Sequence, residues 1–204
     1  GMQVLDLWQR QVTARMIMTA DAFHNALTVD MALGCSTNTV LHLPAIAAEA
    51  GVALDLNMIN RISEKTPHIC SLSPGGAHHI QDLNRAGGIS AVMKTLADTG
   101  LIRGNCRTAT GRTVAENIAG ATIFDSEVIR PMTHPYHQQG GLAVLYGNLA
   151  PDGCVVKQSA VLDEMMRHEG PARVFDSEEA ATAAIMEGRI NKGDVIIVRH
   201  EGPM

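Results

Sequence analysis

The segment Thr19–Asn38, with the sequence TADAFHNALTVDMALGCSTN, carries the clearest local structural signal in the chain. Thr19 can cap a helix with its hydroxyl group, and apolar side chains recur at helical spacing from Phe23 to Met31. Gly34 is a typical helix end because glycine tolerates a left-handed backbone. The segment therefore predicts a helix that ends in a tight turn at 34–38.

Helical patterns continue on the C-terminal side of this turn. A second helix is expected to begin near Ser36 or Thr37 and to end at Gly51. Pro44 falls inside it, but within about two turns of its start, where proline disrupts a helix less than at the centre. Three further helices are expected, each with its own start or stop signal: one capped by Asp55, one over 90–100, and one at the capping-box spacing Thr113–Glu116.

The character of the sequence changes near residue 130. Prolines and glycines between 131 and 141 form a breaker-rich linker, which predicts a domain boundary. We therefore expect an α/β chain that consists of a helix-rich domain at 1–130 and a β-rich domain at 131–204. The second domain reads as unfinished, since its predicted strands have no obvious closing partner.

The second domain shows strand patterns. Residues 142–146 and 154–157 predict two strands joined by a turn at 150–153, and 195–199 predicts a buried strand. An acidic start at 176–179 introduces an Ala-rich helix with a glycine stop. Unpaired edges in such an incomplete sheet predict self-association, so we expect a homodimer.

Composition narrows the class of protein. The chain has 204 residues, 46% of them hydrophobic, and a formal charge of −5. At about 150 residues per domain, its length allows one large domain or two small ones. A mild negative charge argues against nucleic-acid binding, which needs a basic face. No apolar run approaches the roughly 20 residues of a membrane span, and the first residues lack a signal-peptide pattern. These features favour a cytoplasmic location.

The four cysteines are Cys35, Cys70, Cys106 and Cys154. Their spacing is too wide for a CxxC motif or a zinc ribbon. Without export, free thiols are expected rather than disulfides. Each cysteine is therefore interpreted as a small buried apolar residue.

The turn at 34–38 is the first candidate site. Four backbone amides at the start of the second helix are expected to point outward without partners, and Ser36, Thr37 and Asn38 add hydroxyl and amide groups. Together these groups could hold a carboxylate or a phosphate. Plain capping of a helix–turn–helix junction explains the same residues, and the pattern by itself favours capping.

Three other segments carry polar groups with weaker signals. The Ser/Gly loop Ser71–His79 ends in two histidines, and His134 and His137 lie in the breaker-rich linker, but a solvated loop and a plain linker explain them better. Glu201 follows a predicted strand, where functional loops often emerge. The chain has no Walker loop, nucleophile elbow, HExxH or GxGxxG motif, so no catalytic residue and no metal ligand is assigned from pattern alone.

Several blocks of the sequence nevertheless resemble one known family. Gly34–Ala48, GCSTNTVLHLPAIAA, is similar to the segment around the GGSTN motif of the dihydroxy-acid and 6-phosphogluconate dehydratases, although Cys35 replaces the second glycine of that motif. Four more blocks resemble the family in the same order and extend over nearly all of the chain: DLNRAGGI at 82–89 with AVMK at 91–94, YGNLAPDGCVVK at 146–157, GPARVFDSEE at 170–179 and GDVIIVRHEGP at 193–203.

The resemblance implies a hydro-lyase that removes water from a 2,3-dihydroxy acid to give a 2-oxo acid in valine and isoleucine biosynthesis. The family uses an iron–sulfur cluster and Mg²⁺, and the ligands of both lie in segments that this chain does not match. The chain therefore resembles an internal fragment of such an enzyme, which is expected to be inactive alone. The fold implied is the end of a large α/β domain followed by the beginning of a swivelling barrel-like domain. Ser36, Thr37 and Asn38 are then expected to line the substrate pocket.

Two alternatives stay open. One is a sugar-acid dehydratase of the same family, which acts on an aldonate or 6-phosphogluconate. The other is a non-catalytic anion-binding or scaffold module derived from the same ancestor.

Overall fold

The computed structural model describes residues 1–202, so the predicted block at 193–203 ends with Pro203 outside the described residues. The chain divides into two compact units, Gly1–Ala160 and Val161–Met204, and each is considered by itself. The predicted mixed α/β class is confirmed, since helices are combined with two small sheets. Within the described residues, no helix has the length and apolar character needed to cross a membrane.

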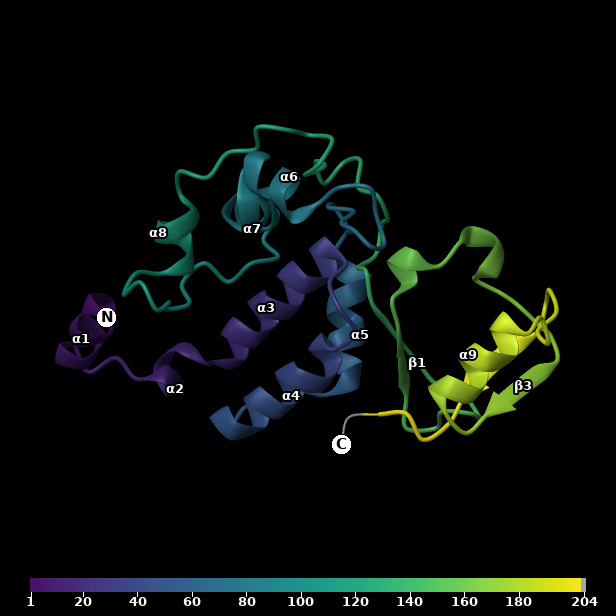
Figure 1. The fold of residues 1–204 in the computed structure, drawn as a ribbon. Helices are drawn as coiled ribbons and strands as arrows, with labels where there is room; N and C mark the ends of the chain where they lie inside the picture. Colours follow the sequence, from purple (N-terminus) through teal and green to yellow (C-terminus); the bar gives the residue numbers. More distant parts are fainter. Residues whose placement is uncertain (203–204) are drawn as a thin grey trace. The chain divides into compact units, whose positions relative to one another are not determined.

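The first unit is built mainly from helices, which Figure 1 shows in chain order from purple to green. Their bounds are α1 Met2–Gln9, α2 Ala14–Ile17, α3 Ala20–Leu33, α4 Thr39–Ala50, α5 Leu56–Lys65, α6 Ile80–Arg85, α7 Gly88–Asp98 and α8 Val114–Ile118. The unit ends with strands β1 Ala143–Leu145 and β2 Cys154–Val156 and the short 3₁₀ helix η1 Gln158–Ala160. The sequence did not predict α1, α2 or α6, all of which are short.

The helix caps that were predicted from capping side chains are confirmed. The Thr19 hydroxyl accepts a hydrogen bond from the Ala22 amide at 3.3 Å at the start of α3. Asp55 accepts from the Met58 amide at 2.6 Å at the start of α5. The capping box of α8 forms between Thr113 and Glu116. The capping hydrogen bonds predicted for these three helix starts are therefore formed.

Two groups of buried apolar side chains hold the first unit together. One surrounds α7 and includes Ile69, Val92, Leu96 and Ile129. The other joins α3, α5 and β1 through Leu27, Met31, Ile59, Ile62, Leu142 and Val144.

Strand β1 is tied to α3 and α5 by polar contacts as well as by packing. It pairs with β2 in an antiparallel ladder, as predicted from the two strand patterns and the intervening turn. The Val144 amide donates to the Asn60 side chain at 3.1 Å, and the Gly141 amide donates to the Met31 carbonyl at 2.9 Å. Segment 140–160 therefore lies against α3 and α5 in the first unit.

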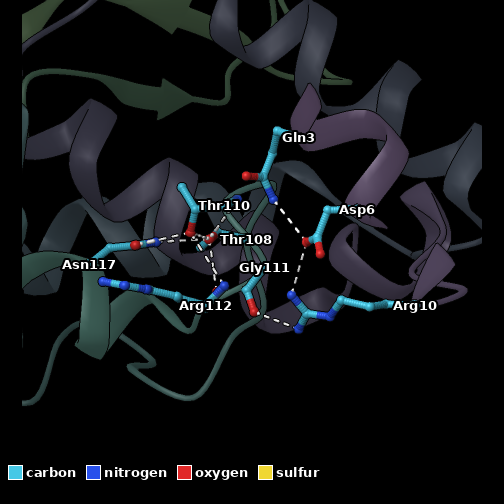
Figure 2. A network of polar contacts seen from close by, with 8 residues as sticks. All are labelled: Gln3, Asp6, Arg10, Thr108, Thr110, Gly111, Arg112 and Asn117. Carbon is cyan, nitrogen blue, oxygen red and sulfur yellow. Dashed lines mark hydrogen bonds and ion pairs between the residues drawn. The ribbon is translucent and has the colours of Figure 1, made fainter. Parts of the chain in front are cut away.

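Helix α1 is held by a polar network rather than by burial, as Figure 2 shows. Arg10 pairs with Asp6 at 3.1 Å and donates to the Gly111 carbonyl at 3.0 Å. In the loop that Arg10 contacts, the Thr108 hydroxyl accepts a hydrogen bond from the Asn117 side chain of α8 at 2.8 Å. Because these groups are exposed, each pair adds little stability.

The second unit contains one parallel strand pair and one helix. Its elements are η2 Asp163–Met165, β3 Ala172–Phe175, α9 Glu178–Met186 and β4 Val195–Val198. Strands β3 and β4 pair in parallel from Ala172–Val195 to Phe175–Val198, with α9 as the connection. The prediction of a buried strand at 195–199 is wrong in its burial, because β4 alternates between half-buried and exposed residues. In the described chain only one strand flanks it, and α9 covers it only in part.

Candidate functional site

The turn between α3 and α4 is fixed by a left-handed glycine. Gly34 has φ 59° and ψ 47°, a conformation that glycine adopts without strain. A Cβ atom at this position would lie 2.5 Å from Nε2 of His68, so the close approach also requires glycine. The turn at 34–38 is therefore held between α3 and the segment that carries His68.

The backbone amides of Asn38, Thr39 and Val40 are not free, so the prediction of four open amides at this helix start is wrong in part. The Asn38 amide donates to the Ser36 hydroxyl oxygen at 3.2 Å, and the Thr39 amide donates to the Ser36 carbonyl at 3.0 Å. The Val40 amide donates to the Thr37 carbonyl at 3.1 Å. A tight turn thus satisfies amides that an ideal helix start would leave open. The exposed side chains of Ser36, Thr37 and Asn38 are the other polar groups of the turn.

Those side chains border a groove of about 400 Å³. Its lining comes from α3, the turn and the first half of α4: Ala26, Asp30, Ser36, Asn38, Thr39, His42 and Leu43. Two of the three predicted site residues, Ser36 and Asn38, therefore face one concave surface. Thr37 is exposed in the same turn but is not among the lining residues.

Asp30 is the residue of this groove that the sequence reading missed. Its side chain is buried, with 8% of the residue exposed, and its Oδ1 accepts from the Thr39 hydroxyl at 2.7 Å. Its Oδ2 has no hydrogen-bond partner among residues 1–202. Burial raises the pKa of the Asp30 carboxyl. The sequence could have indicated that Asp30 is buried. Asp30 follows Phe23 by seven positions, so the two residues share one face of the helix.

The two weaker histidine motifs lie side by side. Nε2 of His78 is 3.1 Å from the Tyr136 hydroxyl, which donates its proton to the Glu127 carbonyl at 2.6 Å. The hydroxyl therefore accepts from His78. By contrast, His79 lies at the start of α6, where its amide donates to Asp82 at 2.8 Å. The adjacent histidines thus face different partners and do not form a ligand pair. The sequence predicted a solvated loop, but these contacts order it.

His68 lies between the Gly34 turn and the linker segment that contains His137. Its ring stacks on that of His137 with centroids 5.2 Å apart, and its amide donates to the His137 carbonyl at 3.0 Å. Burial, together with the neighbouring His137, lowers the pKa of His68 to about 4. The ring is therefore neutral at pH 7, and its Nδ1 has no partner within the described chain.

Residues after β2 complete the surroundings of the turn. Nζ of Lys157 lies 3.6 Å from the position that a Cβ of Gly75 would take, and the Ser159 hydroxyl lies 3.1 Å from the equivalent position on Gly34. The Lys157 charge acts on the Asp30 carboxyl and opposes the rise in its pKa that burial causes. Segments 34–38, 68–79, 134–137 and 157–159 therefore meet in one region, which spacing in the sequence could not reveal.

The cysteines do not form a metal site. All four are free thiols, as predicted, but only Cys70 and Cys106 are buried, whereas Cys35 is half-buried and Cys154 is exposed. Burial raises the pKa of Cys35 and of Cys70 to about 12, which disfavours the thiolate form that binds metals. In residues 1–202 no three His, Cys, Asp or Glu side chains are grouped to hold a metal ion. The side chains described here thus do not fit a cluster or a Mg²⁺ site.

Glu201 has a structural contact in the second unit. Its Oε1 accepts a hydrogen bond from the Glu178 amide at 2.9 Å, at the start of α9. This contact satisfies one of the amides that a helix start leaves open. It gives Glu201 a capping role within that unit.

Comparison with known proteins assigns the class. The N-terminal family model of the dihydroxy-acid/6-phosphogluconate dehydratases matches residues 1–117, and the C-terminal model of the same family matches residues 127–204. These matches show that the chain belongs to the dihydroxy-acid/6-phosphogluconate dehydratase family.

The curated relatives to which the chain is similar are named dihydroxy-acid dehydratases. The chain is 68% identical to a dihydroxy-acid dehydratase of Desulfosudis oleivorans, 64% to one of Moorella thermoacetica and 63% to one of Desulfatibacillum aliphaticivorans. Each match covers 100% of this chain but only 36–37% of the relative. The chain thus spans little more than a third of the length of these relatives.

Proposed function

We propose that the protein to which this chain belongs is a hydro-lyase that dehydrates a 2,3-dihydroxy acid to a 2-oxo acid, in the synthesis of valine and isoleucine. The observation that carries the proposal is the identity of 63–68% over the whole chain to relatives named dihydroxy-acid dehydratase. The ordered matches to both family models support it.

The reaction is balanced without an oxidant or a reductant. A proton leaves C2 and a hydroxide leaves C3, so that one water is lost and an enol forms between the two carbons. Transfer of a proton to C3 then converts the enol into the 2-oxo acid. The protein must bind the carboxylate and both hydroxyl groups in one orientation, because only then do the C2–H and C3–O bonds break together with low cost.

The chain contributes to this orientation through the groove beside the turn. Ser36 and Asn38 line it, and Thr37 is exposed in the same turn, so that hydroxyl and amide groups are available to a polar ligand. We assign substrate binding to Ser36, Thr37 and Asn38. An iron–sulfur cluster and Mg²⁺, which the family uses, supply Lewis acidity. Because the described side chains do not fit them, the proposal places both in the rest of the protein.

The proposed enzyme also has an expected domain architecture, oligomeric state and location. Residues 1–130 form the end of the α/β domain, and residues 131–204 begin a barrel-like domain that further strands complete. The parallel pair β3–β4 supports a sheet that continues, because β3 is mostly exposed and β4 alternates between half-buried and exposed residues. The protein is proposed to act on small molecules as a homodimer in the cytoplasm.

The substrate role of the turn is tested by removing its hydroxyl groups. In the intact enzyme, Ser36→Ala combined with Thr37→Val should raise KM or lower kcat by about tenfold, the effect of losing one or two hydrogen bonds. The measurement is the initial rate of 2-oxo acid formation. Thr110→Val, in the exposed loop before α8, serves as the control. Wild-type kinetics in the double variant would leave Ser36 with a capping role only.

The substrate class is tested with the unmodified intact enzyme. A branched 2,3-dihydroxy acid should be converted with a higher kcat/KM than any aldonate or 6-phosphogluconate. A preference for the sugar acid would replace the proposed function with that of a sugar-acid dehydratase. No conversion of either class would favour a non-catalytic module.

A further inference from the structure

Another pocket of the first unit, which we call the basic pocket, is lined by positively charged side chains. It has a volume of about 320 Å³ and is formed by α3, α5 and the loop after α7. Arg61 and Lys65 contribute to it from α5, and Arg103 contributes from the loop. None of the described residues that line it is a carboxylate, and it shares no lining residue with the groove beside the turn.

The charges of the basic pocket are not neutralised by neighbouring side chains. Arg61 and Lys65 form no ion pair with any residue of the described range 1–202. Arg103 has an ion pair with Asp21 at 3.9 Å, but about half of each side chain is exposed, so the pair is weak. Burial lowers the pKa of His24, which also lines the pocket, and the Arg103 and Lys65 charges lower it further, whereas Asp21 opposes them. The two cations therefore act on the same wall of the pocket.

Arg103 is held in this wall by a buried side chain of α3. Asn25, which is 5% exposed, donates from its side-chain amide to the Arg103 carbonyl at 3.0 Å and accepts from the Arg103 amide at 2.7 Å. The two residues are 78 positions apart, so this pair of hydrogen bonds fixes the loop to the helix. The Arg103 side chain stays 48% exposed and is therefore open to a ligand from solvent. A backbone that is fixed before binding lowers the entropy cost of recognition.

The composition of the basic pocket limits the class of its ligand. Like charges that gather without partners repel one another, and an anion with more than one charge relieves this repulsion. Arginine binds oxyanions through two parallel N–H groups, and lysine adds a point charge. A phosphate group offers a charge close to −2 at pH 7 and three acceptor oxygens. Met58 and Leu101 add apolar surface that suits a small carbon skeleton.

We propose that the basic pocket binds a phosphate group, carried by a small phosphate monoester or present as free phosphate. Arg61 and Arg103 bind the phosphate oxygens through their guanidinium groups, and Lys65 supplies a further positive charge. The volume of about 320 Å³ fits a small ligand, since binding pockets range from about 300 to 1,000 Å³. The inference goes beyond the proposed function and does not depend on it, because it concerns a ligand other than the dihydroxy acid.

The test measures binding to the intact enzyme by calorimetry at constant ionic strength. The probes are glycerol 3-phosphate, inorganic phosphate and succinate, a dicarboxylate of similar charge. Both phosphates should bind at least about tenfold more tightly than succinate, because three oxygens on one phosphorus reach all three cations together. Tighter binding of glycerol 3-phosphate identifies an organic phosphate as the ligand, equal binding of the two identifies free phosphate, and both results support the site.

Single substitutions locate the binding. Arg61→Gln, Lys65→Gln and Arg103→Gln should each weaken phosphate binding by about tenfold, because each removes a charged donor. These variants should fold, since Asn25 holds the backbone of Arg103 and not its side chain. In wild type, phosphate should also raise the unfolding temperature, and this rise should disappear in the triple variant.

Two controls separate a built site from general charge attraction. Arg85→Gln makes the same change of charge on α6, where 81% of the side chain is exposed, and should leave phosphate binding as in wild type. Asp21→Asn removes the carboxylate beside Arg103 and should tighten phosphate binding by up to about threefold. A purely structural role of the pocket predicts no such gain.

Three results would overturn the proposal. Phosphate affinity could be the same in wild type and in the three pocket variants, which would place any binding elsewhere. Succinate could bind as tightly as phosphate, or Arg85→Gln could weaken binding as much as Arg103→Gln, and each would reduce the effect to net charge. All of these measurements use binding and unfolding, so they stand whether or not the enzyme forms a 2-oxo acid.

Discussion

At the scale of single residues, burial determines the chemistry of the candidate site. Asp30 and His68 contain the two buried side-chain atoms that have no hydrogen-bond partner in the part of the chain that the structure describes. Both residues lie beside the Gly34 turn. The Asp30 carbonyl accepts a hydrogen bond from the Cys35 amide, and the His68 ring packs against Gly34. Burial raises the pKa of the acid and lowers that of the imidazole, so both are shifted toward their neutral forms.

His68 should make stability depend on pH in the acidic range. Its pKa is about 4 in the folded chain and about 6.5 when unfolded, so the unfolded chain binds the proton more strongly. The stability that neutral His68 contributes is therefore present above pH 6.5 and is lost as the pH falls toward 4. We expect a loss of up to about 3 kcal/mol over this range.

Urea unfolding at several pH values measures this loss. His68→Asn should reduce the slope of stability against pH between 6.5 and 4, whatever its effect at pH 7. His134→Asn, which changes an exposed histidine in the linker, should leave the slope as in wild type. An unchanged slope in His68→Asn would assign the acid sensitivity to other groups.

At the scale of elements, the helices with strong end signals are those that the sequence predicted best. Helix α3 begins after Thr19 and ends at Gly34, as expected, because cap and stop are local interactions. Helix α4 ends at Gly51 as predicted but begins at Thr39, because the tight turn at 36–38 takes up its expected first residues. Helices α1 and α2 were missed because neither has a side-chain cap, and the apolar residues of α1, such as Val4, Leu5 and Trp8, are exposed rather than buried.

The cap of α5 offers a direct test of this local control. Asp55→Ala removes the acceptor of the Met58 amide and should destabilise the chain by about 1 kcal/mol, within the usual range for N-caps. The effect should appear in global unfolding, because α5 buries Ile59 and Ile62 in the core. Glu49→Ala, on the exposed side of α4, is the matched control. Equal stability of the two variants would mean that packing alone sets the start of α5.

At the scale of the whole molecule, the division of the chain depends on contacts that span many residues. The match to the N-terminal family model ends at residue 117, and the match to the C-terminal model begins at residue 127. The predicted domain boundary at residue 130 stays a prediction. The compact units divide after Ala160 instead, because β1 packs on α5 and the Gly140 amide donates to the Ser63 carbonyl at 2.9 Å. Residues 140–160, which the C-terminal family model matches, thus complete the core of the first unit.

The distribution of metal ligands leads to a prediction for the 204-residue chain. After anaerobic incubation with iron and sulfide, we expect no stoichiometric iron and no visible cluster absorption, because Cys35 and Cys70 have pKa values of about 12 and no third ligand is grouped with them among residues 1–202. The same chain should form no 2-oxo acid from a dihydroxy acid. Iron content, absorption spectra and product assays measure these outcomes, with the intact enzyme as the positive control. Stoichiometric iron in the short chain would contradict our reading of its cysteines.

The amino-acid sequence by itself determined the helix ends, the strand pair β1–β2 and the membership of a dehydratase family, because caps, turns and motif blocks depend on neighbours a few positions apart. Only the tertiary structure decided that the amides of residues 38–40 are hydrogen-bonded, that β4 is half-exposed, and that Asp30 lies in a groove with Ser36 and Asn38. It also brought His68 and Lys157 to the Gly34 turn, from positions far along the chain. The physical reason is that burial and partnering are set by packing between distant segments, which local patterns do not encode.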